Sequence, residues 1–132
     1  MTAAATSSLA RTVLVVDDEH VVRLVMRRFL QRSGWNVAEA ESAEQALALL
    51  DGAVVPDLVI CDLNLPGLTG AELCQRITER QPTLASRLVL TSGDPGSASR
   101  ELERAALDCP VLGKPFSLID LERMVEAVAG TA

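Results

Sequence analysis

Hydrophobic and polar positions repeat along the chain with two periods, which follow each other five times. Short apolar runs typical of buried strands occupy residues 12–18, 35–40, 57–62, 86–93 and 109–113. After each run, apolar residues recur at helical spacing, which predicts helices over 20–34, 42–52, 70–80, 97–107 and 117–130. Alternating strands and helices are typical of a parallel sheet with helices on both faces. The pattern therefore predicts an α/β fold of five βα units.

Two of the predicted helices carry more specific signals. In the segment 20–34 the apolar positions define one helical face, and Gly34 predicts the end of the helix. That face consists of Val21, Val22, Val25, Met26, Phe29 and Leu30. In the segment 42–52, Ser42 is the candidate N-cap and Gly52 closes the helix.

Polar side chains stand where four of the five predicted strands end. The carboxyl ends of parallel strands meet at one edge of a sheet, where ligands of such folds bind. Each of these residues alone has an ordinary structural explanation, such as capping the next helix, but their convergence at one edge indicates a site. The residues are Asp17 and Asp18, then Asp62, then Thr91 and Ser92, and finally Lys114, the only lysine of the chain.

The residue types at this edge suit phosphoryl chemistry. Clustered carboxylates repel each other, which raises the pKa of at least one of them. Hard oxygen ligands suit Mg²⁺, and Lys114 adds a compact, mobile positive charge. A carboxylate could then attack a phosphoryl group while the cations neutralise its oxygens. The single histidine, His20, is expected at the surface, so catalysis of the Ser-His-Asp or Cys-His kind is not indicated.

Composition narrows the class of protein further. The 132 residues are 48% hydrophobic, which fits one folded domain over residues 11–130 after a flexible tail over residues 1–10. The net charge of −6 and the scarcity of aromatic residues argue against direct nucleic-acid binding. No apolar run is long enough to cross a membrane. Three scattered cysteines and the absence of a signal peptide predict free thiols in the cytoplasm.

Four motifs in a fixed order resemble those of the receiver domain of two-component response regulators. They are VLVVDDE (13–19), VICDLNLPGLTG (59–70), LVLTSG (88–93) and LGKPF (112–116). The resemblance covers residues 11–129. It implies a flavodoxin-like (βα)5 single domain whose central parallel five-stranded sheet has the order 2-1-3-4-5, with helices on both faces.

The resemblance also assigns roles to individual residues. Asp62 is implied as the phospho-acceptor, with Lys114 and Thr91 as its catalytic partners. Asp18, Asp62 and the backbone carbonyl of Asn64 are implied as direct ligands of Mg²⁺, and Asp17 as a ligand through a water molecule. The family typically has a cis peptide bond between the lysine and the next residue, here Pro115. Pro66 and Gly70 match the turn after the acceptor strand.

The chain departs from the family pattern on the fifth strand. Val111 replaces the aromatic residue that usually switches between two positions when the threonine moves. Ser92 stands where the family prefers a very small residue, and a serine is tolerable there. We therefore expect activation to act through the loop 91–97 and not through residue 111.

The implied function is a phospho-accepting switch. Asp62 would take a phosphoryl group from the phosphohistidine of a histidine kinase or phosphotransfer protein. The domain would catalyse only its own phosphorylation and slow dephosphorylation, and would thus be no metabolic enzyme. A homodimer through the surface of the fourth and fifth helices is a further implied contact. The domain could stand alone or form part of a hybrid histidine kinase or a longer regulator.

Three other classes compete with this function. A pseudo-receiver, an interaction module without phosphoryl chemistry, is disfavoured because the set Asp17, Asp18, Asp62, Thr91 and Lys114 is intact. A phosphatase-like hydrolase usually has a second acid two residues after the nucleophile, where this chain has an asparagine. A flavodoxin-like electron carrier is disfavoured because the acidic sequence DDEH would repel the phosphate of its cofactor.

Overall fold

A five-stranded parallel sheet forms the centre of the computed structural model, which describes residues 10–130. The predicted tail falls, except for residue 10, outside the described residues. The strand order is β2-β1-β3-β4-β5, which confirms the predicted topology. The strands are β1 (Thr12–Val16), β2 (Asn36–Ala40), β3 (Leu58–Asp62), β4 (Leu88–Ser92) and β5 (Val111–Gly113).

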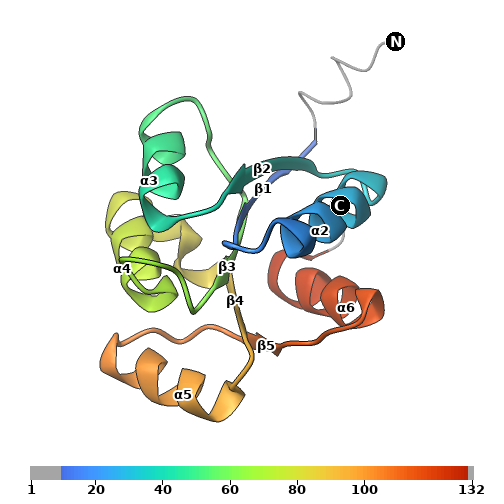
Figure 1. Ribbon diagram of the computed structural model, residues 1–132. Helices are drawn as coiled ribbons and strands as arrows, with labels where there is room; N and C mark the ends of the chain where they lie inside the picture. Colours follow the sequence, from blue (N-terminus) through green and yellow to red (C-terminus); the bar gives the residue numbers. More distant parts are fainter. Residues whose placement is uncertain (1–9, 131–132) are drawn as a thin grey trace.

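Helices cover both faces of this sheet. In Figure 1, α2 and α6 lie on one face, and α3, α4 and α5 lie on the other. The helices are α2 (His20–Arg32), α3 (Ala43–Asp51), α4 (Gly70–Arg80), α5 (Pro95–Arg104) and α6 (Leu118–Ala129). A short 3-10 helix, η1 (Pro82–Ser86), was not predicted from the pattern and shortens the fourth strand at its start. None of the helices in residues 10–130 has both the length and the apolar character that a membrane span requires.

The core is divided by the sheet into two apolar layers. One layer contains Met26 and Leu30 of α2 and Leu121 of α6, and the other contains Leu73 and Ile77 of α4. All five residues of β3 are buried, as expected for a central strand of a sheet covered on both faces. The acceptor candidate Asp62 therefore stands at the end of a fully buried strand.

Side-chain caps fix where the helices begin. The Ser42 hydroxyl accepts a hydrogen bond from the backbone N–H of Gln45, which confirms it as the N-cap of α3. At the start of α4, Thr69 and Glu72 form a reciprocal capping box. A second capping box is formed by Ser117 and Asp120 at the start of α6. These caps hold the helices that follow β3 and β5 at defined positions beside the polar edge of the sheet.

The prediction of the apolar face of the first helix was partly wrong, because two of its valines are exposed. Val21 is 68% exposed and Val25 is 45% exposed, whereas the buried positions of α2 are Arg23, Met26 and Leu30. A helix on a sheet buries only one stripe of its surface, and here that stripe lies to one side of the predicted centre. One consequence is that an arginine lies inside and two valines lie outside.

The fourth predicted helix begins and ends earlier than expected. It starts at Pro95, with the side chain of Asp94 accepting a hydrogen bond from the N–H of Ser97 at 3.2 Å. Proline suits the first position of a helix because its missing N–H would have no partner there. After the helix ends at Arg104, Ala106 adopts φ of 56°, in the left-handed region.

At the other end of the sheet, Arg11 joins the beginning of β1 to the end of α6. Its guanidinium donates to the backbone oxygens of Ala129 (2.7 Å) and Gly130 (3.0 Å). The same group lies 4.3 Å from the ring centre of Trp35, a cation–π contact. This contact lies at the end of β1 opposite to the predicted site.

Candidate functional site

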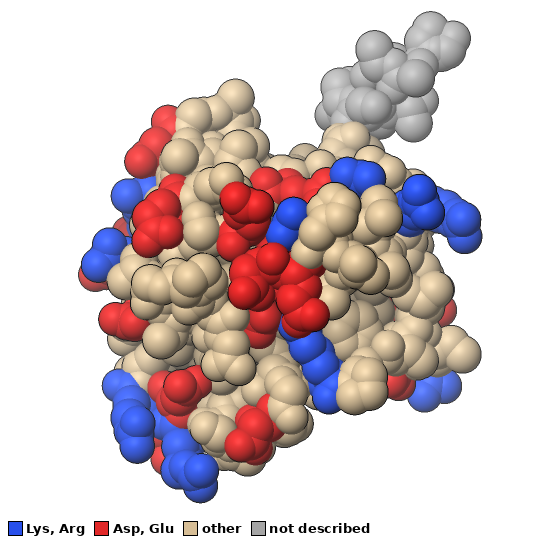
Figure 2. Space-filling view, viewed as in Figure 1, with Lys and Arg blue, Asp and Glu red and all other residues tan. Residues whose placement is uncertain are grey.

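Four carboxylates gather where β1 and β3 end. Asp17, Asp18, Glu19 and Asp62 each place one oxygen within 4.8 Å of the others. Figure 2 shows acidic side chains collected near the middle of this face, with a basic side chain directly below them. The convergence expected from parallel strands is thus present, and Glu19 belongs to the cluster as well.

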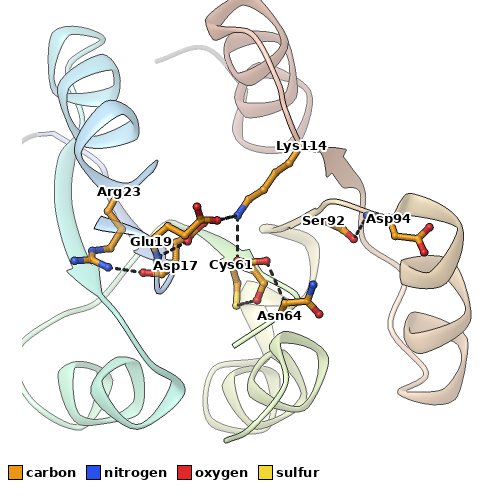
Figure 3. Close-up of polar contacts among 9 residues, drawn as sticks. Asp17, Glu19, Arg23, Cys61, Asn64, Ser92, Asp94 and Lys114 are labelled. Carbon is orange, nitrogen blue, oxygen red and sulfur yellow. Dashed lines mark hydrogen bonds and ion pairs between the residues drawn. The ribbon is translucent and has the colours of Figure 1, made fainter. Parts of the chain in front are cut away.

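Lys114 contacts three of these carboxylates. Its Nζ donates to Asp17 Oδ2 at 2.9 Å and Asp62 Oδ2 at 3.0 Å, and lies 3.4 Å from Glu19 Oε1 (Figure 3). The Lys114 backbone N–H donates to the Ser92 carbonyl at 2.7 Å, which ties this residue to the end of β4. The Lys114–Pro115 peptide bond is cis.

The two nearer carboxylates, Asp17 and Asp62, hold the ammonium between them. Burial alone would lower the pKa of Lys114, but hydrogen bonds to Asp17 and Asp62 and the negative charges of both raise it overall. Lys114 is therefore fully charged at neutral pH. A flexible ammonium can shift between acceptors, which a planar guanidinium does less readily.

Asp62 is a buried carboxylate that receives a hydrogen bond from the loop after β3. It is 5% exposed, and its Oδ1 accepts from the backbone N–H of Asn64 at 3.1 Å. Burial raises the pKa of this carboxyl, the bonds from Asn64 and Lys114 lower it, the charge of Asp17 raises it, and the net effect is a rise. The expected rise of one pKa in the cluster is present, although burial contributes more to it than the neighbouring charge.

Thr91 lies directly beside Asp62. The two residues are register partners of β4 and β3. Thr91 is 0% exposed, and within the described part of the chain its hydroxyl has no hydrogen-bond partner. A buried hydroxyl without a partner costs about 1–3 kcal/mol, so this position is incomplete without an additional acceptor.

The remaining candidates, Ser92 of β4 and Val111 of β5, stabilise neighbouring parts of the fold. The Ser92 hydroxyl accepts from the backbone N–H of Asp94 at 3.0 Å, so it supports the loop before α5 (Figure 3). Val111 is half-buried, pairs with Leu90, and packs against the apolar layer that contains α5. Neither side chain joins the carboxylates.

The turn after β3 depends on close backbone packing. A side-chain carbon on Gly70 would lie 2.7 Å from Leu63 Cα and still closer to the carbonyl oxygen of Asp62. The N–H of Gly70 donates to the Leu63 carbonyl at 2.9 Å. Helix α4 therefore begins against the backbone at the end of β3, which only glycine permits.

Sequence reasoning missed one buried residue of this region, Arg23. Its Nη1 donates to the backbone carbonyl of Asp17 at 2.6 Å, and it also lies near Glu39 and His20. Positions 23, 26 and 30 share one helical stripe, but a charged residue on such a stripe does not by itself indicate burial. His20 itself is exposed, as expected.

The carboxylate cluster fits a bound divalent cation. All of its ligand atoms are hard oxygens, which is the donor set that Mg²⁺ prefers. Asp18 and Glu19 are exposed, which leaves room for metal-bound water on the solvent side. The residues present therefore fit Mg²⁺ as expected from the sequence.

Comparisons with known proteins agree with this fold. The response regulator receiver domain family matches residues 13–126. The chain is 37% identical over 120 residues to the two-component response regulator ORR6 of rice (Oryza sativa), and this match covers 88% of the chain and 69% of the relative. It is 32% identical to the phosphate regulon regulatory protein PhoB of Pseudomonas aeruginosa, with 91% and 52% covered. The chain thus spans about half the length of PhoB.

Solved structures lead to the same class. The response regulator TrrA of Thermotoga maritima, determined in complex with Mg²⁺ and BeF, superposes with a TM-score of 0.75 at 28% identity, with 89% of this chain and 98% of that one covered. The fold and the acidic edge define a receiver domain of two-component signalling. The chain belongs to the response regulator receiver domain family.

Proposed function

We propose that Asp62 accepts a phosphoryl group from the phosphohistidine of a histidine kinase or phosphotransfer protein, in a Mg²⁺-dependent reaction. Asp62 supports this role because it lies at the open edge of the sheet and is held between Asn64 and Lys114. Its two oxygens have different partners, so the carboxylate has one defined orientation. The phosphorylated and unphosphorylated forms would be the two states of a signalling switch.

The observation that carries this proposal is the hydroxyl of Thr91. It is buried beside Asp62 and has no partner among the described residues. A phosphoryl oxygen on Asp62 would be a strong acceptor for this donor. A phosphoryl group on Asp62 that is present in only one of two states would thus explain why the buried Thr91 hydroxyl has no partner in the other state.

The chemical step needs no other nucleophile. A carboxylate oxygen of Asp62 attacks phosphorus, the bond between phosphorus and the histidine nitrogen breaks, and the electron pair leaves with the imidazole. Lys114 then pairs with a phosphoryl oxygen, since its Nζ already touches Asp62 Oδ2. Thr91 donates to another phosphoryl oxygen.

Metal binding is proposed at the same carboxylates. Asp18, Asp62 and the backbone carbonyl of Asn64 would be the direct ligands, and Asp17 would act through a water molecule. Bound Mg²⁺ would supply positive charge opposite the negative charge of the phosphoryl oxygens. Asp17 is already oriented by Lys114 and by the N–H of Glu19, which donates to its Oδ1 at 2.8 Å.

An apolar groove beside the site supports a protein as the phosphoryl donor. It has a volume of about 410 Å³, and Glu19 and Lys114 of the polar site belong to its lining. Exposed apolar residues next to a reactive centre are typical of a protein contact. The apolar part of the lining consists of Val21, Val22, Val25, Pro115 and Phe116.

The domain is proposed to catalyse only its own phosphorylation and slow dephosphorylation. A pseudo-receiver is opposed by the assembled contacts of Lys114 with Asp17 and Asp62. We place the reaction in the cytoplasm, where free thiols such as the buried Cys61 and Cys74 persist. A dimer through the surface of α5 and α6 remains a prediction.

Mass spectrometry of the intact protein tests the function. The protein is incubated with acetyl phosphate and Mg²⁺, and we expect one phosphoryl adduct that disappears in Asp62→Asn. Asp94→Asn is the matched control, because Asp94 lies near the same sheet edge, outside the carboxylate cluster, and asparagine also caps helices well. An adduct of unchanged yield in Asp62→Asn would refute the assignment of the acceptor.

A further inference from the structure

A buried arginine, Arg23, contacts the backbone of the acidic cluster. Arg23 is 8% exposed, although arginine is rarely buried without a specific partner. Its Nη1 donates to the carbonyl oxygen of Asp17 at 2.6 Å, and in Figure 3 it approaches Asp17 from the side opposite to Lys114. The bond is made to the backbone, so Arg23 does not neutralise the Asp17 carboxylate directly.

Asp17 is held at every polar group by a different partner. Its N–H donates to the Ala40 carbonyl at 3.1 Å, which extends the pairing of β1 with β2. Its carbonyl accepts from Arg23, and its two carboxylate oxygens accept from the Glu19 N–H and from Lys114. The Arg23 bond thus fixes the peptide plane that joins Asp17 to Asp18.

The position of Arg23 is itself fixed by β2. Its Nε lies 3.4 Å from Glu39 Oε1, and Arg27 Nη1 contacts the other oxygen of Glu39 at 2.6 Å. Glu39 is oriented by two arginines, and in the described part of the chain Arg23, not Arg27, contacts Asp17. Arg27 therefore offers a matched control.

We propose that Arg23 is a positioning residue for the metal site. By holding the Asp17 carbonyl, it sets the direction in which Asp17 and Asp18 present their carboxylates to the cation. The inference rests on the Mg²⁺ site of the proposed function. Groups that orient metal ligands typically change metal affinity about 10- to 100-fold when they are removed.

The direction in which the Mg²⁺ affinity changes when Arg23 is replaced distinguishes a positioning role from a purely electrostatic one. Loss of a positive charge near four carboxylates would by itself strengthen the binding of a cation. Loss of the carbonyl contact would weaken it, because Asp17 and Asp18 would no longer be held for the metal. A purely structural role would lower the melting temperature and leave the Mg²⁺ affinity unchanged.

Calorimetric titration with MgCl₂ is the test, on wild type, Arg23→Gln, Arg23→Lys and Arg27→Gln, each checked for folding by circular dichroism. We expect Kd to rise about tenfold or more in Arg23→Gln. Arg23→Lys keeps the charge without the planar fork and should fall between that variant and wild type. Arg27→Gln should bind within about twofold of wild type, well below the effect typical of an orienting group.

The outcomes distinguish this inference from the function on which it rests. Wild type that binds no Mg²⁺, or Asp18→Ala that binds it equally well, would overturn the metal site itself. With that site established, a folded Arg23→Gln that binds Mg²⁺ as tightly as wild type, or more tightly, would overturn the role of Arg23. If Arg23→Gln does not fold, wild-type affinity in folded Arg23→Lys overturns it instead.

Discussion

Replacing Gly70 by alanine should both destabilise the fold and reduce phosphorylation of Asp62. The added methyl would meet backbone atoms at the end of β3, namely the Asp62 carbonyl and Leu63 Cα. Backbone atoms cannot rotate away as the end of a side chain can. Either α4 must move off the sheet, or the strand that carries Asp62 must shift.

The size of the effect follows from these contacts. The distance of 2.7 Å to Leu63 Cα lies about 0.7 Å below the 3.4 Å at which ordinary contact begins. Overpacking of this kind typically costs about 1–3 kcal/mol. Gly70 is the first residue of α4, so the preference of helix interiors for alanine over glycine offsets little of this cost. We expect a net loss of about 2 kcal/mol, a large part of the stability of a small domain.

Urea unfolding followed by circular dichroism measures this loss. With a slope of roughly 2 kcal/mol per molar urea, the midpoint should fall by about 1 M. Gly93→Ala is the control, because a side-chain carbon there would meet nothing within 4 Å. The phosphoryl adduct should also decrease in Gly70→Ala alone. Equal midpoints for the two variants would show that the close approach at Gly70 is not real.

Two further changes test other parts of the molecule. Ala106→Gly should stabilise the protein by about 0.5–1 kcal/mol in the same urea assay, because Ala106 has φ of 56°, which disfavours residues with a side chain. Ala105→Gly, at φ of −85°, should not stabilise, and equal effects of the two changes would contradict the explanation. Val111→Ile should leave the yield of phosphoryl adduct essentially unchanged, because the half-buried Val111 packs against the α5 side of the core and does not contact the carboxylates. If activation acts through the loop 91–97, the changes in backbone amide NMR shifts on adding beryllofluoride should concentrate in residues 92–98. Large changes at 110–112 without changes in this loop would refute that route.

Most of the candidate site could be predicted because it depends on topology alone. Once the strands are parallel, the residues that follow them must meet at one edge, and this brings Asp17, Asp62, Thr91 and Lys114 together without any knowledge of side-chain geometry. The resemblance added the strand order, which periodicity does not determine. The early start of α5 could also have been predicted from the sequence, since Asp94 followed by Pro95 is a common way to begin a helix.

The remaining features depend on distances that a linear pattern does not contain. The buried stripe of α2 could not be placed within one residue, so Val21 and Val25 were expected inside and Arg23 was overlooked. The contact of Lys114 with Asp17 depends on how a long side chain lies between two acids. The left-handed Ala106 carries no sequence signal, because alanine has no preference for that conformation.

The Arg11 contact has a consequence for how force and motion reach this domain. Arg11 holds the end of α6 at the start of β1, and five residues of strand, about 16 Å, separate that point from Asp17. A pull or twist applied to residue 11 or to residue 130 therefore enters the molecule at the same place. The load is shared by the arginine, Trp35 and the last turn of α6 before it reaches the carboxylates. Tethering the domain by residue 11 or residue 130 would accordingly leave the acidic face free to approach a partner.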